Sequence, residues 1–343
     1  MTAATPVTPA TPAAEALLEL THVSLDIPVR GELRRVIHDV TLTITGGESL
    51  GLVGESGSGK SMTARTIMRL IRRGWVAGGS VVFDGEDVYR MDPQRLRRLR
   101  GSDIAMIYQD PRAHTNPVRT NGDSLMEGML AQGMSRDAAR QRALELLAEV
   151  GIPDGERRMR QYPHELSGGL LQRIMIAAAV SLTPRLLLAD EPTTALDVTT
   201  QEEVMAILDE QRQERGLAML VITHDLDLAA AVTDRIAVMY AGVILEVAPS
   251  ASLHGASRHP YTVGLLASRP VVGTRSRLRT IPGRPLSAFE AGPGCVFASR
   301  CPFVAEVCTA ERPQLRPMGD HLVACHRVEE IATELADWAE ADR

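Results

Sequence analysis

The chain has 343 residues, of which 44% are hydrophobic and 23% are charged, and its formal net charge is −6. This length allows two domains, and the acidic balance argues against a dedicated nucleic-acid-binding protein. No apolar run approaches the about 20 residues that a membrane helix needs. The N-terminus also lacks a charged segment followed by an apolar one, which excludes a secretory signal. We therefore expect a cytosolic protein.

The first part of the chain predicts a short β-rich region behind a tail. Residues 1–14 are mostly Ala, Thr and Pro, a composition that predicts disorder. Stretches rich in β-branched residues then predict an antiparallel β portion, with strands at 17–20, 23–27 and 40–44. The apolar strand 49–53 follows. A helix is predicted at 61–70, because its apolar residues share one face.

Between this strand and helix lies the stretch 54–61, which fits the pattern G-x-x-x-x-G-K-[ST] of a phosphate-binding loop. Its glycines allow backbone angles that turn successive N–H groups around phosphate oxygens, and the helix N-terminus adds its dipole. Lys60 brings a positive charge to the β- and γ-phosphates, and the Ser61 hydroxyl can bind Mg²⁺. Taken alone, the eight residues leave open a glycine-rich turn that binds nothing.

The middle of the chain predicts an α/β domain interrupted by helices. Strands at 81–83 and 104–108 flank a short basic helix at 94–100. The region 122–182 is helical, and its clearest helix, 135–150, has a Ser cap and ends at Gly151. Beyond it, strands at 185–189, 218–223 and 236–240 alternate with helices at 199–215 and 226–232. This alternation predicts a mostly parallel, covered sheet.

Polar residues follow three of these strands. Asp190 and Glu191 end an apolar strand, where one carboxylate can hold Mg²⁺ and the next can act as a general base. A turn or a helix cap is the alternative. His224 can contact the γ-phosphate, and Gln109 can orient water or Mg²⁺. Taken alone, each of these two residues is better explained by a structural role.

Together, these motifs resemble an ATP-binding-cassette nucleotide-binding subunit over about residues 15–250. The ordered set comprises the phosphate loop, Gln109, Leu166-Ser167-Gly168-Gly169, Asp190-Glu191, Ala195-Leu196-Asp197 and His224. The resemblance implies an α/β P-loop NTPase fold with a mostly parallel sheet, an N-terminal antiparallel β portion and a helical signature subdomain at about 122–182. The ATPase domain would span 15–255.

The resemblance also assigns roles to residues. ATP would be bound by Gly54, Glu55, Ser56, Gly57, Ser58, Gly59, Lys60, Ser61, Met62, Gln109 and Asp190. Ser61, Gln109 and Asp190 would hold Mg²⁺. Glu191 would be the catalytic base, assisted by His224, Lys60 and Gln109. Ser167, Gly168 and Gly169 would close over the γ-phosphate of ATP bound to a partner subunit, so that ATP joins two subunits and hydrolysis releases them.

The chain departs from the family pattern at two places. Leu170 and Leu171 follow the signature glycines, where the family usually has Gln or Met and then Arg or Gln. Ile27 stands about where the family stacks an aromatic side chain on adenine. We therefore expect apolar packing of adenine, assisted by Arg34 or Arg35, and weaker ATP binding than in a relative with the aromatic residue.

From about residue 250 the Pro, Gly and Arg content rises, which predicts a separate, loop-rich C-terminal extension at 256–343. Within it, the sequences at 258–262, 281–283 and 294–302 resemble the C-terminal region of oligopeptide and dipeptide importer ATPases. The four cysteines of the chain all lie in this extension: Cys295, Cys301, Cys308 and Cys325.

Four thiolates can hold a [4Fe–4S] cluster or a zinc ion. The spacing lacks the close C-x₂-C pairs of structural zinc sites, which favours iron–sulfur, and the resemblance implies the same cluster. Free thiols and disulfides are the alternatives.

The resemblance implies an ATPase that powers an importer of di- or oligopeptides from the cytoplasmic face of the membrane. Its partners would be a second ATPase subunit, forming a heterodimer first and a homodimer second, two permease subunits and an extracytoplasmic substrate-binding protein, but no nucleic acid. An importer of another solute, such as glutathione, is the alternative. A cassette ATPase acting on nucleic acid or ribosomes, or a non-catalytic regulator, fits less well. The acidic balance argues against the first, and the set Lys60, Asp190, Glu191 and His224 against the second.

Overall fold

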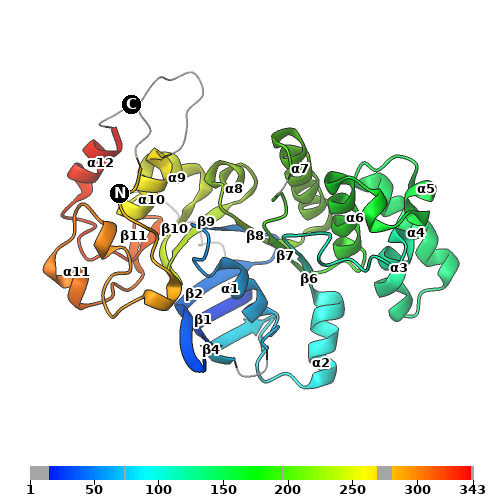
Figure 1. The fold of residues 1–343 in the computed structure, drawn as a ribbon, viewed down its shortest axis with the longest axis horizontal. Coiled ribbons are helices and arrows are strands. Elements are labelled where there is room, and N and C mark those ends of the chain that lie inside the picture. Colours follow the sequence, from blue (N-terminus) through cyan, green and yellow to red (C-terminus); the bar gives the residue numbers. More distant parts are fainter. Residues whose placement is uncertain (1–14, 73–74, 195, 269–279, 341–343) are drawn as a thin grey trace, which may run out of the picture.

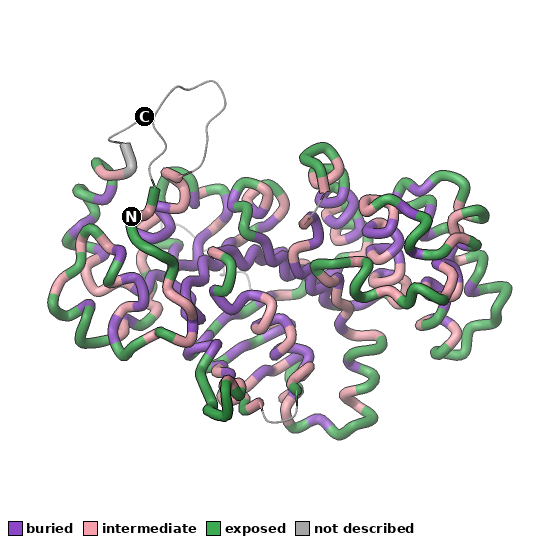
Figure 2. The backbone as a smooth tube through the Cα atoms, viewed as in Figure 1, coloured by how far each residue is buried: buried purple, intermediate pink, exposed green. Residues whose placement is uncertain are grey.

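The computed structural model describes residues 15–72, 75–194, 196–268 and 280–340. The predicted tail 1–14 lies outside these residues. The molecule is elongated, with two sheets in its middle, a group of helices at one end and the C-terminal extension at the other (Figure 1). Buried residues are concentrated in the central strands, as Figure 2 shows. Among the described helices, none has the length and apolar character to cross a membrane.

The N-terminal region forms a four-stranded sheet in the order β2-β1-β4-β5, and all its pairs are antiparallel. Its strands are β1 (Ala16–Val29), β2 (Glu32–Thr45), β4 (Val76–Phe83) and β5 (Glu86–Asp87). The antiparallel β portion is thus confirmed. The sequence divided β1 into two strands. The structure keeps it continuous through register shifts around His22, whose φ of 50° marks a bulge that absorbs the break in alternation.

An eight-stranded sheet forms the centre, in the order β11-β12-β10-β9-β3-β8-β7-β6. Its parallel part consists of β3 (Ser49–Val53), β6 (Ile104–Ile107), β7 (Leu186–Asp190), β8 (Ala218–Thr223) and β9 (Arg235–Tyr240). Every residue of β3, β7 and β8 is buried, which explains their uninterrupted apolar sequences.

Neighbouring residues of β7 belong to different cores. Leu186 and Leu188 pack into the cluster shared with the antiparallel sheet and α1 (Lys60–Ile67). Leu187 and Ala189 pack into a second cluster with α7 (Val198–Arg215) and the helical insert. The sheet is therefore covered on both faces, as the strand-and-helix alternation predicts.

The helical insert consists of α3 (Asn121–Ala131), α4 (Arg136–Glu149), α5 (Gly155–Arg160) and α6 (Gly168–Val180). The Ser135 hydroxyl accepts a hydrogen bond from the Ala138 N–H and caps α4, as its sequence predicts. Leu146 and Leu171 are fully buried between these helices. The insert joins the rest of the molecule at the β6–β7 edge (Figure 1).

Further short helices lie between the strands and, in the case of α12, after the last strand. They are α2 (Pro93–Arg98), α8 (Leu226–Val232), α9 (Ser250–Ala256), α10 (Pro260–Ala267), α11 (Glu306–Ala310) and α12 (Ala332–Glu340). Asp92 caps α2 by accepting hydrogen bonds from two backbone N–H groups, and a short π-helical segment, Leu99–Asp103, leads from α2 into β6.

The C-terminal extension shares the central sheet, although the sequence suggested a separate unit. β10 (Val243–Pro249) pairs antiparallel with β9 on one side and with β12 (His321–Val323) on the other, and β11 (Arg316–Met318) completes the sheet. β11 and β12 have three residues each, too few for a recognisable alternation of apolar and polar residues.

A buried carboxylate fastens the extension to β10. Glu246 is fully buried and accepts hydrogen bonds from the Arg258 and His259 N–H groups, at 2.8 and 3.1 Å. Its carboxylate also lies 2.8 Å from His321 Nδ1 on β12. Burial raises the pKa of Glu246, but the hydrogen bonds from His321 and from the Arg258 and His259 N–H groups outweigh it and hold the pKa below its usual value. One side chain thereby joins β10, β12 and the start of α10.

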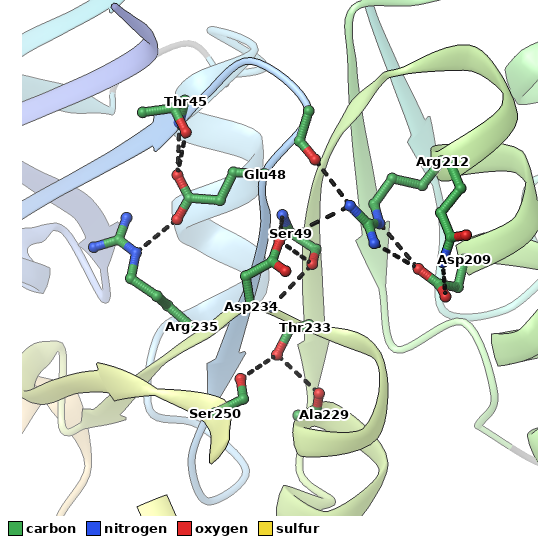
Figure 3. A network of polar contacts seen from close by, with 12 residues as sticks. Thr45, Glu48, Ser49, Asp209, Arg212, Ala229, Thr233, Asp234, Arg235 and Ser250 are labelled. Carbon is green, nitrogen blue, oxygen red and sulfur yellow. Dashed lines mark hydrogen bonds and ion pairs between the residues drawn. The ribbon is translucent and has the colours of Figure 1, made fainter. Parts of the chain in front are cut away.

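A polar network fixes the amino ends of β3 and β9 (Figure 3). Glu48 accepts a hydrogen bond from Arg235 at 2.6 Å, and the Asp234 carboxylate accepts from both the Ser49 N–H and its hydroxyl at 2.8 Å. Arg212 of α7 donates to the Gly47 carbonyl at 2.9 Å. These contacts hold the start of the strand whose other end carries the phosphate loop.

Candidate functional site

The phosphate loop connects the buried strand β3 to helix α1, as predicted. Two of its glycines are required by their surroundings. A Cβ on Gly54 would lie 2.0 Å from the Met239 carbonyl oxygen, and Gly59 has a φ of +105° with the Val36 carbonyl 3.2 Å from the site of a Cβ. The loop is therefore pressed against β2 and β9, and side chains there would displace it.

Lys60 and Ser61 connect the loop to the strand-end carboxylates. Lys60 is buried, and its Nζ donates to the Gly54 and Glu55 carbonyls at 2.8 and 3.1 Å. Burial lowers the pKa of Lys60, while the carboxylates nearby oppose this shift. The Ser61 hydroxyl donates to Asp190 Oδ1 at 2.7 Å. Burial raises the pKa of Asp190, and the Ser61 hydrogen bond opposes it. A hydroxyl beside a carboxylate provides the hard oxygen ligands that Mg²⁺ prefers.

The Glu191 side chain lies close to two other predicted site residues, Gln109 and His224. Its Oε2 accepts hydrogen bonds from Gln109 Nε2 and Thr194 Oγ1, each at 2.9 Å, and lies 3.7 Å from His224 Nδ1. Glu191 has a φ of 47°, and its N–H donates to the Ile222 carbonyl at 2.8 Å. The ends of the neighbouring strands β6, β7 and β8 thus bring three predicted residues together. Thr194 was missed, because a threonine in a turn carries no distinguishing signal.

The signature residues Ser167, Gly168 and Gly169 lie at the start of α6 in the helical insert. Ser167 caps α6 by accepting a 3.4 Å hydrogen bond from the Leu170 N–H, and a Cβ on Gly169 would meet the Thr200 methyl group at 2.7 Å. Leu171 is fully buried in the helical core. In Figure 1, α6 lies in the helical group, well apart from α1 and the phosphate loop. The predicted contact of these residues with a partner's nucleotide stays a prediction.

The region expected to hold adenine contains an aromatic residue from the extension. Ile27 is half-buried and pairs with Arg34 across the β1–β2 hairpin. Arg34 donates to the Phe289 carbonyl at 3.1 Å, and its guanidinium lies 5.7 Å from the centre of the Phe289 ring. Arg35 is paired with Asp26 at 2.8 Å. The sequence analysis missed Phe289, which is 255 residues from Arg34 and lies in a segment without regular periodicity.

The four cysteines line one small cavity of about 20 Å³ together with apolar side chains that include Phe297, Phe303 and Ile331. All four are free thiols, so the disulfide alternative is not what this structure shows. Burial raises the pKa of Cys301 to about 12 and that of Cys325 to about 11. Within the described ranges, however, no three or more His, Cys, Asp or Glu side chains form a group that could hold a metal ion.

The fold and the contacts around the loop define a P-loop ATPase, with a lysine, a hydroxyl and two strand-end carboxylates at the carboxyl edge of a parallel sheet. The sequence pattern of the family described as "ABC transporter" matches residues 37–194. That of "Oligopeptide/dipeptide transporter, C-terminal region" matches residues 245–308.

Proteins that are similar to this chain in sequence or structure support the same class. A putative peptide import ATP-binding protein of Brucella melitensis biotype 1 is 44% identical over 312 residues, which cover 86% of this chain and 92% of that protein. Another, from Brucella abortus (strain 2308), is also 44% identical, with coverage of 90% and 94%. The ATP-binding cassette MJ0796, solved as a dimer bound to ADP and Pi, is 29% identical, with a TM-score of 0.62 and coverage of 68% and 98%.

The chain therefore belongs to the ABC transporter family. It binds ATP with Mg²⁺ and hydrolyses ATP. The predicted fold class is confirmed, including the antiparallel portion and the helical insert.

Proposed function

We propose that the chain is the ATP-hydrolysing subunit of a membrane importer of di- and oligopeptides. The match of residues 245–308 to the C-terminal region of oligopeptide and dipeptide transporters carries this proposal, because this segment lies outside the 37–194 match common to ABC transporters. The names of the Brucella relatives, which cover most of the chain, support it.

The test is uptake by the complete transporter. The chain, its permease subunits and its substrate-binding protein are reconstituted in proteoliposomes, with ATP supplied on the side of the ATPase subunits. Labelled di- and oligopeptides should accumulate, and a Lys60→Ala variant should abolish uptake. Accumulation of glutathione but of no peptide would favour the alternative solute class and refute the peptide assignment.

For the ATP site we infer a division of roles that the contacts support. The loop N–H groups and Lys60 hold the β- and γ-phosphates, with Met62 in the first turn of α1. Ser61, Asp190 and Gln109 hold Mg²⁺, which when bound offsets the negative charge that develops on the transferring phosphoryl group. Glu191 accepts the proton of the attacking water. The Glu191 carboxylate is oriented by Gln109, Thr194 and His224.

We also infer that two ATPase subunits form each active site. Ser167, Gly168 and Gly169 stand at the N-terminus of the thirteen-residue helix α6, where backbone N–H groups favour an anion. Their distance from the chain's own loop supports a role toward a partner's ATP (Figure 1). The dimeric state of the solved cassette supports the same arrangement.

A heterodimer with a related subunit is the first choice for this pair, and a homodimer is the second. The two would act at the cytoplasmic face of the membrane on two permease subunits, with a substrate-binding protein on the other side. Residues 15–255 form the ATPase domain in this proposal. The insert at 122–182 docks on the permease, and residues 256–343 form the transporter-type extension.

The formation of an ATP-bound dimer can be tested with a variant that hydrolyses ATP slowly. Glu191→Gln protein with ATP should form a dimer, with itself or with the related subunit, in size-exclusion chromatography coupled to light scattering. Ser167→Arg should prevent this dimer while leaving ATP binding to the monomer intact. A Ser167→Arg protein that still dimerises with ATP would contradict the composite site.

Finally, we propose that the four cysteines hold a [4Fe–4S] cluster, with zinc as the alternative. All four thiols face one apolar cavity, which supports a shared ligand. The raised pKa values of Cys301 and Cys325 mean that these two thiols stay protonated unless a metal replaces their protons. Anaerobically purified protein should absorb near about 400 nm and contain iron, which is typical of such clusters. Zinc without iron would favour the alternative, and absence of both metals would refute the metal site.

A further inference from the structure

The phosphate loop is held from outside the ATPase core by an arginine of the C-terminal extension. Arg300 Nη1 lies 3.0 Å from Glu55 Oε2 and 3.3 Å from Glu55 Oε1. The Arg300 side chain is only 5% exposed, and that of Glu55 is 23% exposed. Glu55 is the second residue of the loop, so this ion pair joins positions 245 residues apart in the chain.

Arg300 is itself fixed on several sides. Its Nε donates to the Pro282 carbonyl at 2.9 Å, and its Nη1 also donates to the Tyr240 hydroxyl at 3.2 Å. Its guanidinium lies 5.7 Å from the centre of the Tyr240 ring. A guanidinium held in this way fixes the position of the carboxylate that it binds.

A second residue of the extension binds the backbone of the same loop position. The Glu55 N–H donates to the Tyr261 hydroxyl at 3.2 Å. Tyr261 lies in the first turn of α10, is fully buried, and packs against Tyr240 with ring centres 4.6 Å apart. Glu55 is thus bound through its side chain by Arg300 and through its N–H by Tyr261, while its carbonyl accepts from Lys60.

These contacts matter because of the charge of Glu55. A carboxylate within a loop that surrounds phosphate groups opposes their binding, unless a cation neutralises it and keeps it turned away. Arg300 does both. The Tyr261 hydroxyl also accepts a hydrogen bond from the Glu55 N–H, which fixes the loop backbone at this position.

We propose that Arg300, together with Tyr261, is a positioning residue of the nucleotide site, through which the C-terminal extension sets the affinity of the phosphate loop for ATP. This inference goes beyond the proposed transport function and does not depend on the transported solute. The contacts on which it rests involve no residue that lines the cysteine cavity, although Cys301, which does, follows Arg300 directly in the chain.

The experiment compares full-length variants by titration with a fluorescent ATP analogue and by ATPase kinetics. Arg300→Ala should weaken ATP binding about tenfold, which corresponds to about 1.4 kcal/mol, and should raise KM more than it lowers kcat. Arg300→Lys should lose less, because it keeps the charge. The matched control is Arg316→Ala, which removes an exposed ion pair with Glu329 in the same extension and should leave ATP affinity unchanged.

A double-mutant comparison separates positioning from a purely structural role, because Arg300 also holds the Pro282 carbonyl. In a Glu55→Gln background the carboxylate is absent, so adding Arg300→Ala should change ATP affinity less than twofold relative to Glu55→Gln alone. Its effect on thermal unfolding should persist. If Arg300→Ala weakens ATP binding equally in both backgrounds, the proposal is wrong.

If Arg300→Ala does not fold, Arg300→Lys and Tyr261→Phe carry the test. Tyr261→Phe removes only the hydroxyl that accepts from the Glu55 N–H and should weaken ATP binding about threefold, less than the loss of the charge pair. Unchanged ATP affinity in both folded variants would overturn the inference.

Discussion

Replacing Glu191 by glutamine isolates its proposed function as a base. In the native site, Glu191 Oε2 accepts hydrogen bonds from Gln109 and Thr194, and the backbone of Glu191 is fixed by its bond to Ile222. The amide oxygen of glutamine can accept the same two hydrogen bonds. The substitution therefore preserves the geometry and removes only the negative charge and the ability to take a proton.

The expected size of the effect follows from that difference. General-base catalysis contributes about 10²- to 10⁴-fold to a rate, or about 3 to 5 kcal/mol of activation free energy. We expect kcat for ATP hydrolysis to fall within this range in the Glu191→Gln variant. In our proposal the phosphate contacts come from the loop and from Lys60 and not from Glu191, so the affinity for ATP should change by less than about threefold.

The assay is steady-state phosphate release by the reconstituted transporter, combined with an ATP titration. Thr194→Ala provides the comparison, because it removes one orienting hydrogen bond but leaves the carboxylate, and should lower kcat by a smaller factor. A Glu191→Gln protein that hydrolyses ATP at the native rate would show that another group is the base. Equal losses in kcat and ATP affinity would show that the substitution disturbed the whole site.

Three other properties can be tested on the purified chain. Gly54→Ala places a Cβ 2.0 Å from the Met239 carbonyl, so the loop must move and isothermal titration should detect no ATP binding. Gly57→Ala meets no atom within 4 Å and is strained only by its φ of +80°, so it should retain part of the binding. Ile27→Tyr should tighten ATP binding several-fold by offering a ring for adenine, and an unchanged Kd would count against the predicted adenine position. Burial lowers the pKa of His38 from its usual 6.5, so the folded state favours the neutral ring. The contribution of the neutral His38 ring to the free energy of unfolding is then fully present above pH 6.5, and it decreases below pH 6.5 as the unfolded chain takes up the proton. The fall in Tm between pH 7 and 5 should therefore be smaller in His38→Gln.

The sequence was sufficient for the parts of the site in which local pattern and spatial position coincide. β3, which precedes the loop, and β6, β7 and β8, which precede Gln109, Glu191 and His224, are mostly apolar runs, largely buried and followed by polar residues. Parallel strands place their carboxyl ends at one edge of a sheet, so linear order alone brought Gln109, Glu191 and His224 together. Their catalytic roles remain predictions.

What the sequence could not provide are contacts between distant segments. Phe289 beside Arg34 and Arg300 on Glu55 both depend on how the extension folds back over the ATPase domain. No periodicity marks these residues, because they lie in short turns whose positions are set by tertiary packing. β11 and β12 were missed for the same reason, since a three-residue strand is defined by its partner and not by its own sequence.

The extension is more than an appended domain, because its residues Arg300 and Tyr261 contact Glu55 of the phosphate loop. β9 provides both Met239, whose carbonyl requires glycine at position 54, and Tyr240, whose hydroxyl contacts Arg300. The strand that contacts Gly54 of the loop is thus also the strand that contacts Arg300 of the extension. A displacement of the extension relative to β9 changes the position of Arg300, and with it the charge that faces Glu55. In our proposal, nucleotide affinity therefore depends on the packing of Arg300 and Tyr261 against β9.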